Sequence, residues 1–142
     1  MKRRHKSEVA RLVCDGRWKT KHLRAFRTQF GDTALFDVFF DPFDSSSDSE
    51  YTFYEQQFFG QLLLEFQPEC PIPLDSVIER SLEKWNRSVE ELPWYFERCF
   101  GQAAVLNTTR EIAKRGGLTN EEIEKLKTFR YWLVGPIAAR DA

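Results

Sequence analysis

The charges of this chain are segregated along the sequence. Residues 1–27 hold ten Lys or Arg against two acids, and residues 28–70 hold nine Asp or Glu and neither Lys nor Arg. The remainder is balanced, so the formal net charge of −1 conceals blocks of +8, −9 and 0. A field this uneven either attracts a charged partner or is neutralised when the two blocks meet within one fold. Three explanations follow: internal neutralisation, a protein partner, or a nucleic acid or anionic membrane.

Length and composition are typical of one soluble globular domain. The chain has 142 residues, 42% hydrophobic and 30% charged, and can bury a core without disulfides or a metal ion. Thirteen Phe and four Trp predict a core rich in rings. No apolar run approaches the roughly 18 residues of a membrane span. The odd number and wide spacing of Cys14, Cys70 and Cys99 favour reduced thiols in a cytoplasmic protein.

Apolar residues recur at helical spacing in most of the chain. The segments with this spacing are 17–30, 34–40, 51–66, 74–85, 93–100 and 120–134. Three further sites have the spelling of a capping box, in which a hydroxyl is followed three residues later by Glu. They are Ser88 with Glu91, Thr108 with Glu111, and Thr119 with Glu122. No alternation of β-branched residues indicates a sheet.

We therefore predict an all-α fold, a single compact helical domain of about five to seven helices over residues 17–135. Its first helix is basic and amphipathic, and an acidic, Ser-rich loop near 41–49 is expected to be polar and mobile. Residues 1–16 are assigned to a basic N-terminal arm whose order the sequence does not determine. Residues 136–142 are assigned to a C-terminal tail.

The sequence contains no catalytic motif that we can identify. Its two His do not form a metal-binding His-Glu-x-x-His pattern, and its seven Gly form neither a nucleophile elbow nor a phosphate loop. Cys14 and His22 share a basic segment, which could activate a thiol. A structural Cys and a His on a helix face are the simpler interpretation. We therefore expect a noncatalytic protein without a cofactor.

One segment could bind calcium. Residues 44–55 resemble the twelve-residue loop of EF-hand proteins, with oxygen ligands at alternating positions and a Glu at the last. The candidate ligands are Asp44, Ser46, Asp48, Glu50 and Glu55. Against this, Ser49 stands where the loop needs Gly for its sharp turn, and Pro42 would disrupt the entering helix. The alternative is a solvated acidic loop that leads into a helix.

Residues 109–128 are similar to the helix-turn-helix unit of DNA-binding regulators. Ala113 falls on the first helix, Gly117 in the turn, and Ile123 and Leu126 under the second helix. The second helix carries three acids, which would face the phosphates of DNA. They are Glu121, Glu122 and Glu124. The alternative is a pair of packed helices joined by a glycine corner.

Two groups of residues are candidates for partner binding. The basic segment from Lys2 to Arg27 could bind phosphates, a membrane surface or the groove of a protein. Farther along the chain, consecutive aromatic residues cannot all point inward from one helix, and Arg lies next to them. The candidate residues are Arg17, Lys21, Arg24, Arg27, Trp94, Tyr95, Arg98, Arg130, Tyr131 and Trp132.

From these features we predict a noncatalytic protein–protein interaction module, such as a small adaptor or inhibitor. The alternative is a nucleic-acid-binding factor that uses the basic N-terminal segment together with the unit at 109–128.

Overall fold

The computed structural model describes residues 3–135, with side chains from Lys6 onward. These residues form eight α-helices and one short 3₁₀ helix, and none of them is in a strand. The elements are α1 (Arg3–Cys14), α2 (Thr20–Phe30), α3 (Asp32–Phe40), η1 (Asp41–Phe43), α4 (Phe53–Phe66), α5 (Leu74–Ser81), α6 (Glu91–Phe100), α7 (Gln102–Arg115) and α8 (Asn120–Val134). The all-α prediction is confirmed, with one helix more than the upper predicted count. The tail predicted at 136–142 lies outside the described residues.

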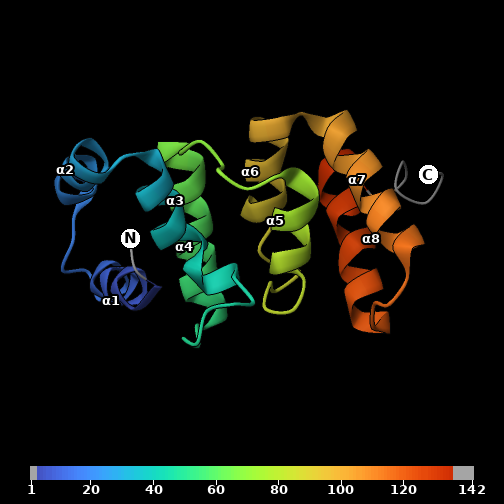
Figure 1. Ribbon diagram of the computed structural model, residues 1–142, viewed down its shortest axis with the longest axis horizontal. Helices are drawn as coiled ribbons and strands as arrows, with labels where there is room; N and C mark the ends of the chain where they lie inside the picture. The colour runs from blue at the N-terminus through green and yellow to red at the C-terminus, as the bar shows by residue number, and fades with distance from the viewer. Residues whose placement is uncertain (1–2, 136–142) are drawn as a thin grey trace.

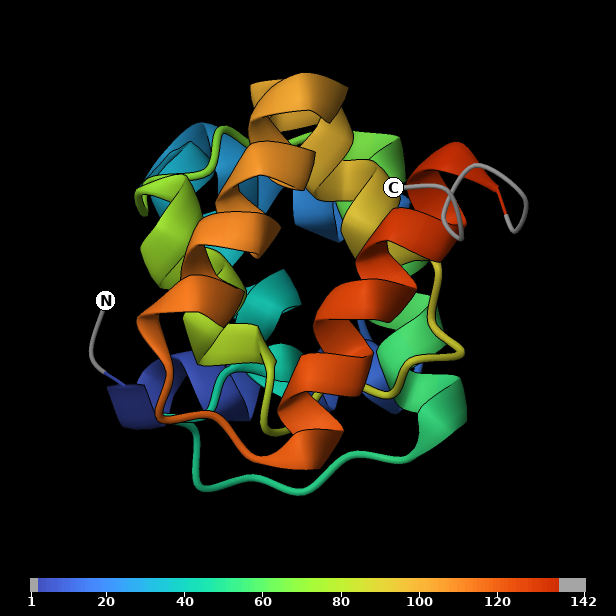
Figure 2. The same ribbon diagram turned by 90° about the vertical axis from the view of Figure 1, so that its right-hand side faces the viewer.

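The helices follow one another along the long axis of the molecule (Figure 1). α1 and α2 lie at one end, α3 to α6 form the middle, and α7 and α8 lie at the other end, which faces the viewer in Figure 2. α4 packs against α3 and α6, and α7 packs against α5, α6 and α8. The buried apolar side chains form one cluster that extends from Val9 in α1 to Phe129 in α8. All eight helices therefore contribute to a continuous core.

The core is rich in aromatic rings, as the composition predicts. Phe96 stacks on Phe129 with ring centroids 6.0 Å apart, and Trp85 lies 4.7 Å from Phe129. The buried Trp85 donates its indole N–H to the carbonyl of Val89 at 2.9 Å. Rings this large bury much apolar area, and the polar group of Trp85 is satisfied by the backbone.

The N-terminal segment is a packed helix and not an open arm. Val9, Ala10 and Val13 form the buried face of α1, which contacts α3 and η1. The charged side chains around this face shorten the apolar stripe to a few residues, and so the sequence pattern did not predict a helix here. α1 therefore accounts for the difference between the predicted upper count of seven helices and the eight that are present.

The loop at 41–49 is anchored by a buried carboxylate, so the prediction of a mobile loop is wrong. The side chain of Asp44 is completely buried and accepts hydrogen bonds from Arg80 Nη2 at 2.6 Å and Lys6 Nζ at 3.2 Å. The backbone N–H of Ser46 donates to the same carboxylate at 2.9 Å. Burial alone would raise the pKa of Asp44, but the hydrogen bonds from Arg80 and Ser46 outweigh it and hold the pKa at about 2.

Three ion pairs join the basic block to the acidic block among the described residues. They are Lys6 with Asp44 at 3.2 Å, Arg11 with Glu55 at 2.9 Å and Arg27 with Asp32 at 2.6 Å. The guanidinium of Arg27 also donates to the carbonyl of Phe66 at 2.8 Å, which ties α2 to the end of α4. Part of the segregated charge is therefore neutralised inside the fold.

Replacing Asp44 should destabilise the protein and reduce its sensitivity to acid. Asp44→Ala leaves Lys6 and Arg80 without their carboxylate, at a cost of about 3 kcal/mol in the free energy of unfolding. Because folding lowers the pKa of Asp44 from 3.8 to about 2, its contribution is present above about pH 4 and is lost as the pH falls toward 2. Urea unfolding of both proteins at neutral pH and at about pH 3 measures this. If the free energy of unfolding fell by the same amount between neutral pH and pH 3 in both proteins, the prediction would be wrong.

Gly60 brings α4 and α6 into close contact. A Cβ atom at Gly60 would lie 2.8 Å from the Cβ of Glu91 and 3.4 Å from Cγ1 of Val89. A Cβ cannot move without its backbone, so the clash with Glu91 would push the two helices apart.

Gly60→Ala should therefore destabilise the protein, although Ala is the better helix former. Helix propensity alone would stabilise by about 1 kcal/mol, whereas overpacking costs about 1 to 3 kcal/mol. We expect a net loss in thermal or urea unfolding. In a Glu91→Gly background the clash disappears, so the double variant should lose less than the sum of the two single variants. A net gain in stability from Gly60→Ala would contradict the contact.

Candidate functional site

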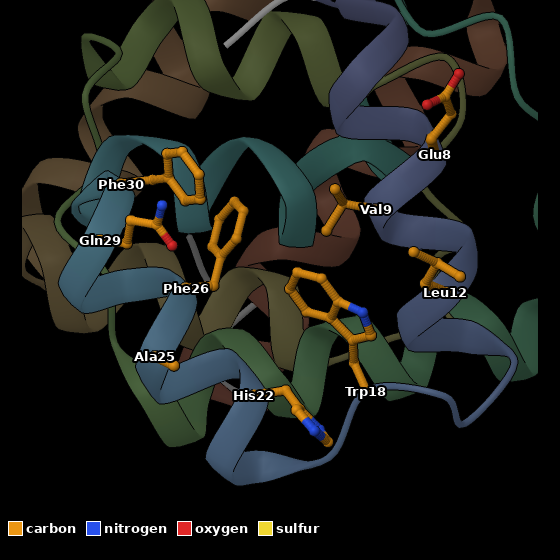
Figure 3. A pocket seen from close by; sticks show the side chains of 9 residues that line it. All are labelled: Glu8, Val9, Leu12, Trp18, His22, Ala25, Phe26, Gln29 and Phe30. Atoms are coloured by element: carbon orange, nitrogen blue, oxygen red, sulfur yellow. The ribbon is translucent and has the colours of Figure 1, made fainter.

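An apolar groove opens between α1 and α2, with a volume of about 470 Å³ (Figure 3). Val9 and Leu12 line it from α1, and Trp18, Phe26 and Phe30 line it from the opposite side. Leu12, Phe26 and Phe30 each lie on the inner faces of their helices in Figure 3. The groove therefore exists only because α1 is folded against the rest of the chain.

The wall opposite α1 is a row of three rings, with Trp18 in the segment just before α2 and Phe26 and Phe30 on α2. Trp18 meets Phe26 edge to face at 5.5 Å, and Phe26 lies 4.9 Å from Phe30. Phe26 is only 4% exposed, whereas Phe30 at the end of the row is 51% exposed. Phe30 extends the apolar lining of the groove onto the surface, and contiguous exposed apolar surface of this kind is typical of binding sites.

Polar groups lie at both ends of the groove. In Figure 3, His22 lies at one end, and Gln29 lies beside Phe30 at the other. His22 Nδ1 accepts the backbone N–H of Lys19 at 2.9 Å, which satisfies one of the amides at the start of α2. This hydrogen bond assigns the proton to Nε2, which is left as a donor. An apolar floor with donors at its ends can fix the position of a ligand.

Several exposed cations lie along α2 and the segment before it. The side chains of Arg17, Lys21 and Arg24 take part in none of the ion pairs or hydrogen bonds of the described residues. Helical geometry places Lys21 one turn before Ala25, which lines the groove. The predicted candidate Arg27 differs from these three, because it is paired with Asp32.

The second group of predicted partner-binding residues does not form one exposed surface. Tyr95 is fully buried and donates its hydroxyl to the carbonyl of Pro68 at 2.6 Å, so its prediction as a contact residue is wrong. Trp94 and Trp132 are half-buried, and the indole N–H of Trp132 donates to the carbonyl of Arg87 at 2.8 Å. Tyr131 is 43% exposed.

The two Arg of this group also differ from each other. Arg98 is exposed near the end of α6, whereas Arg130 of α8 is half-buried and its buried Nε has no hydrogen-bond partner. α6 lies in the middle of the molecule, and α8 lies at the end opposite α2 (Figure 1). The ten candidate residues therefore belong to separate parts of the surface and of the core.

The helix-turn-helix-like unit uses its cations for internal contacts. Lys125 of α8 is buried and donates Nζ to the carbonyls of Leu82 at 2.6 Å and Glu83 at 3.0 Å, just after α5. Arg115 at the end of α7 pairs with Glu79 of α5 at 2.7 Å. The contacts of Lys125 and Arg115 stabilise the packing of α7 and α8 on α5. Lys127 pairs with Glu124 within α8 at 3.2 Å, and Lys114 is exposed.

The predicted calcium loop is not arranged as a metal site. Its first ligand, Asp44, faces Arg80 and Lys6, and the carboxylate of Glu55 accepts hydrogen bonds from Arg11 and from the N–H of Thr52. In the part of the chain that is described, no three His, Cys, Asp or Glu side chains meet as metal ligands. Cations take the place that Ca²⁺ would need, so the hypothesis is corrected to an ion-paired loop.

The cysteine nucleophile also lacks support. Cys14 is half-buried, and its burial and the negative charge of Glu55 raise the pKa of the thiol to about 12. A thiol with this pKa is protonated at neutral pH and is a weak nucleophile. His22, which shares the basic segment with Cys14, accepts the N–H of Lys19 through Nδ1. Cys14, Cys70 and Cys99 are all free thiols.

Comparisons with protein-family models, curated proteins and solved structures find no match to this chain. Across residues 3–135, no helix combines the length and the apolar character that crossing a bilayer requires. The function must therefore be inferred from the groove between α1 and α2 and from the charges around it.

The two Phe rings of the groove should differ sharply in their effect on stability. Phe26→Ala removes a buried ring and should cost about 3 to 4 kcal/mol. Phe30→Ala removes a half-exposed ring and should cost less than about 1 kcal/mol. Urea unfolding of the two variants measures the difference. A loss for Phe30→Ala as large as that for Phe26→Ala would show that Phe30 supports the fold and is not available to a partner.

Proposed function

We propose that this protein is a noncatalytic protein-binding module whose binding site is the groove between α1 and α2. The observation that carries the proposal is the half-exposed Phe30 at the open end of an apolar cavity of about 470 Å³. Exposing this ring to water costs free energy in the isolated protein, and a partner that covers it recovers that free energy.

The composition of the groove supports a protein partner. Aromatic side chains and Arg are enriched where binding energy is concentrated in protein interfaces, and charged residues are depleted at the centre of such interfaces. Here the rings of Trp18, Phe26 and Phe30 form the centre, and Arg17 and Lys21 lie in the segment that forms this wall.

Both walls are held in place before any partner arrives. Lys6 and Arg11 fix α1 through their pairs with Asp44 and Glu55. Arg27 fixes the end of α2 through Asp32. A groove that does not have to be assembled on binding loses little conformational entropy, which favours affinity.

A nucleic-acid-binding factor is the second candidate, because the unpaired Arg17, Lys21 and Arg24 could also contact phosphates. This candidate is the weaker one, because Lys125 and Arg115 contact α5 and the segment just after it, which leaves the unit at 109–128 few cations for DNA. Binding to duplex DNA across a salt series separates the two functions. Nucleic-acid binding requires an affinity that falls steeply with salt.

Peptides that bind the protein should do so through the groove. A display library of random peptides about 14 residues long is selected on the intact protein, and the enriched peptides are titrated against two variants. Ala25→Trp fills the groove at an exposed lining position, and Ala103→Trp adds the same ring to an exposed position on α7. We expect a loss of at least about tenfold with Ala25→Trp, because an interface centre carries most of the affinity. Ala103→Trp should have no effect.

The proposal is contradicted if no peptide is enriched, or if the enriched peptides bind Ala25→Trp as tightly as the unchanged protein. Circular dichroism and urea unfolding of both variants establish that they are folded before they are compared.

A further inference from the structure

The geometry points to an occupant of definite chemistry for this groove: a short amphipathic helix of a partner protein, with large apolar anchors and with acidic residues along the edge that faces α2. This inference rests on the proposed function and adds the class of the partner. It is drawn from the backbone of the two walls, the length and volume of the groove, and the position of the charges.

The walls of the groove favour a helix over an extended peptide. Both are α-helices, whose N–H and C=O groups are bonded within each helix except at the ends. An extended peptide gains most of its affinity from backbone hydrogen bonds to a free sheet edge, and no described residue is in a strand. A helix brings its own backbone bonds and needs only apolar contact.

The dimensions of the groove fit about two turns of such a helix. Its polar ends, His22 and Gln29, are separated by seven residues of α2, which corresponds to about 10 Å along the helix axis. Apolar residues at positions i, i+4 and i+7 of a partner helix cover a similar length. The cavity of about 470 Å³ accommodates large side chains against Trp18 and Phe26.

The unpaired positive charge beside the groove lies on one side, and this sets the orientation of the partner. At the start of α2, the side chains of Arg17 and Lys21 are exposed and unpaired among the described residues. On α1, Lys6 and Arg11 are paired with Asp44 and Glu55. Acidic residues of the partner are therefore attracted to the edge along α2.

Three matched peptides test the inference on the intact protein. They share one apolar face, with Leu, Phe and Leu at positions i, i+4 and i+7, and they carry Glu, Gln or Lys along one flank. Fluorescence anisotropy measures their affinities at low and high salt. At low salt we expect the Glu peptide to bind about three- to tenfold more tightly than the Gln peptide, and the Lys peptide to bind most weakly. The difference should shrink at high salt, because exposed charges are screened.

Charge reversal identifies the edge that is responsible. Lys21→Glu should weaken binding of the Glu peptide by at least about fivefold and strengthen binding of the Lys peptide. Lys114→Glu is the matched control, since it makes the same reversal at an exposed position on α7. It should change neither affinity by more than about twofold. Both sites are exposed, so the fold should tolerate both substitutions.

Trp18 reports where the peptides bind. The change in fluorescence emission on adding peptide should be absent in Trp18→Phe, because the other three Trp lie outside the groove lining. A change that persists in Trp18→Phe would place the peptide elsewhere and overturn the inference.

Other results overturn the inference but not the proposed function. Equal binding of the Glu and Gln peptides, or a preference for the Lys peptide, would show that the partner is not acidic, while peptides from the random library still compete for the groove. Dimerisation at micromolar concentration that Ala25→Trp abolishes would show that a second copy is the occupant. One further result would overturn the proposed function as well: if phosphatidylserine vesicles or a 20-base-pair duplex change the emission of Trp18 and neither the Glu peptide nor the library peptides do, the groove serves a membrane or a nucleic acid.

Discussion

The buried carboxylate of Asp44 connects three distant parts of this chain. Lys6 reaches it from α1 and Arg80 from α5, and Ser46 closes the loop around it. The neighbouring Asp41 is also buried and accepts the hydroxyl of Tyr51 at 2.6 Å. Because a buried charge is tolerated only when it is compensated, these contacts require α1 and α5 to stay in place. The wall that α1 contributes to the groove therefore depends on a carboxylate outside the groove.

The sequence predicted an all-α fold because apolar residues recur at helical spacing in long helices with broad apolar faces, such as α4 (Phe53–Phe66). It did not predict α1, whose buried face is small and whose cations are compensated by acids far along the chain. The capping box at Thr119 is confirmed, but Thr108 lies within α7, which begins at Gln102 after the Gly101 corner. A local pattern cannot show whether a Thr ends up at the start of a helix or within it.

The candidate site was predicted only in part. The cations of residues 17–30 were identified from the amphipathic pattern of that segment, and Arg17, Lys21 and Arg24 are exposed as the pattern requires. The helix itself begins only at Thr20. The groove itself was missed, because it needs α1 to supply Val9 and Leu12. Because α6 contains consecutive aromatic residues, Tyr95 was predicted to be exposed. It is buried instead, and its hydroxyl donates to the carbonyl of Pro68, 27 residues away. Contacts of this kind depend on tertiary packing, which neither composition nor periodicity contains.

The long separation between Lys6 and Arg80 has a consequence for the order of folding. During synthesis α1 and α2 leave the ribosome well before the loop that carries Asp44, and that loop precedes Arg80 on α5. The apolar face of α1 must therefore wait for α3 and η1, which follow α2 in the chain, and so its docking is a late and nonlocal event. Until then Trp18 and Phe26 lack the wall that α1 provides. The surface proposed for binding would thus be among the last parts of the molecule to mature.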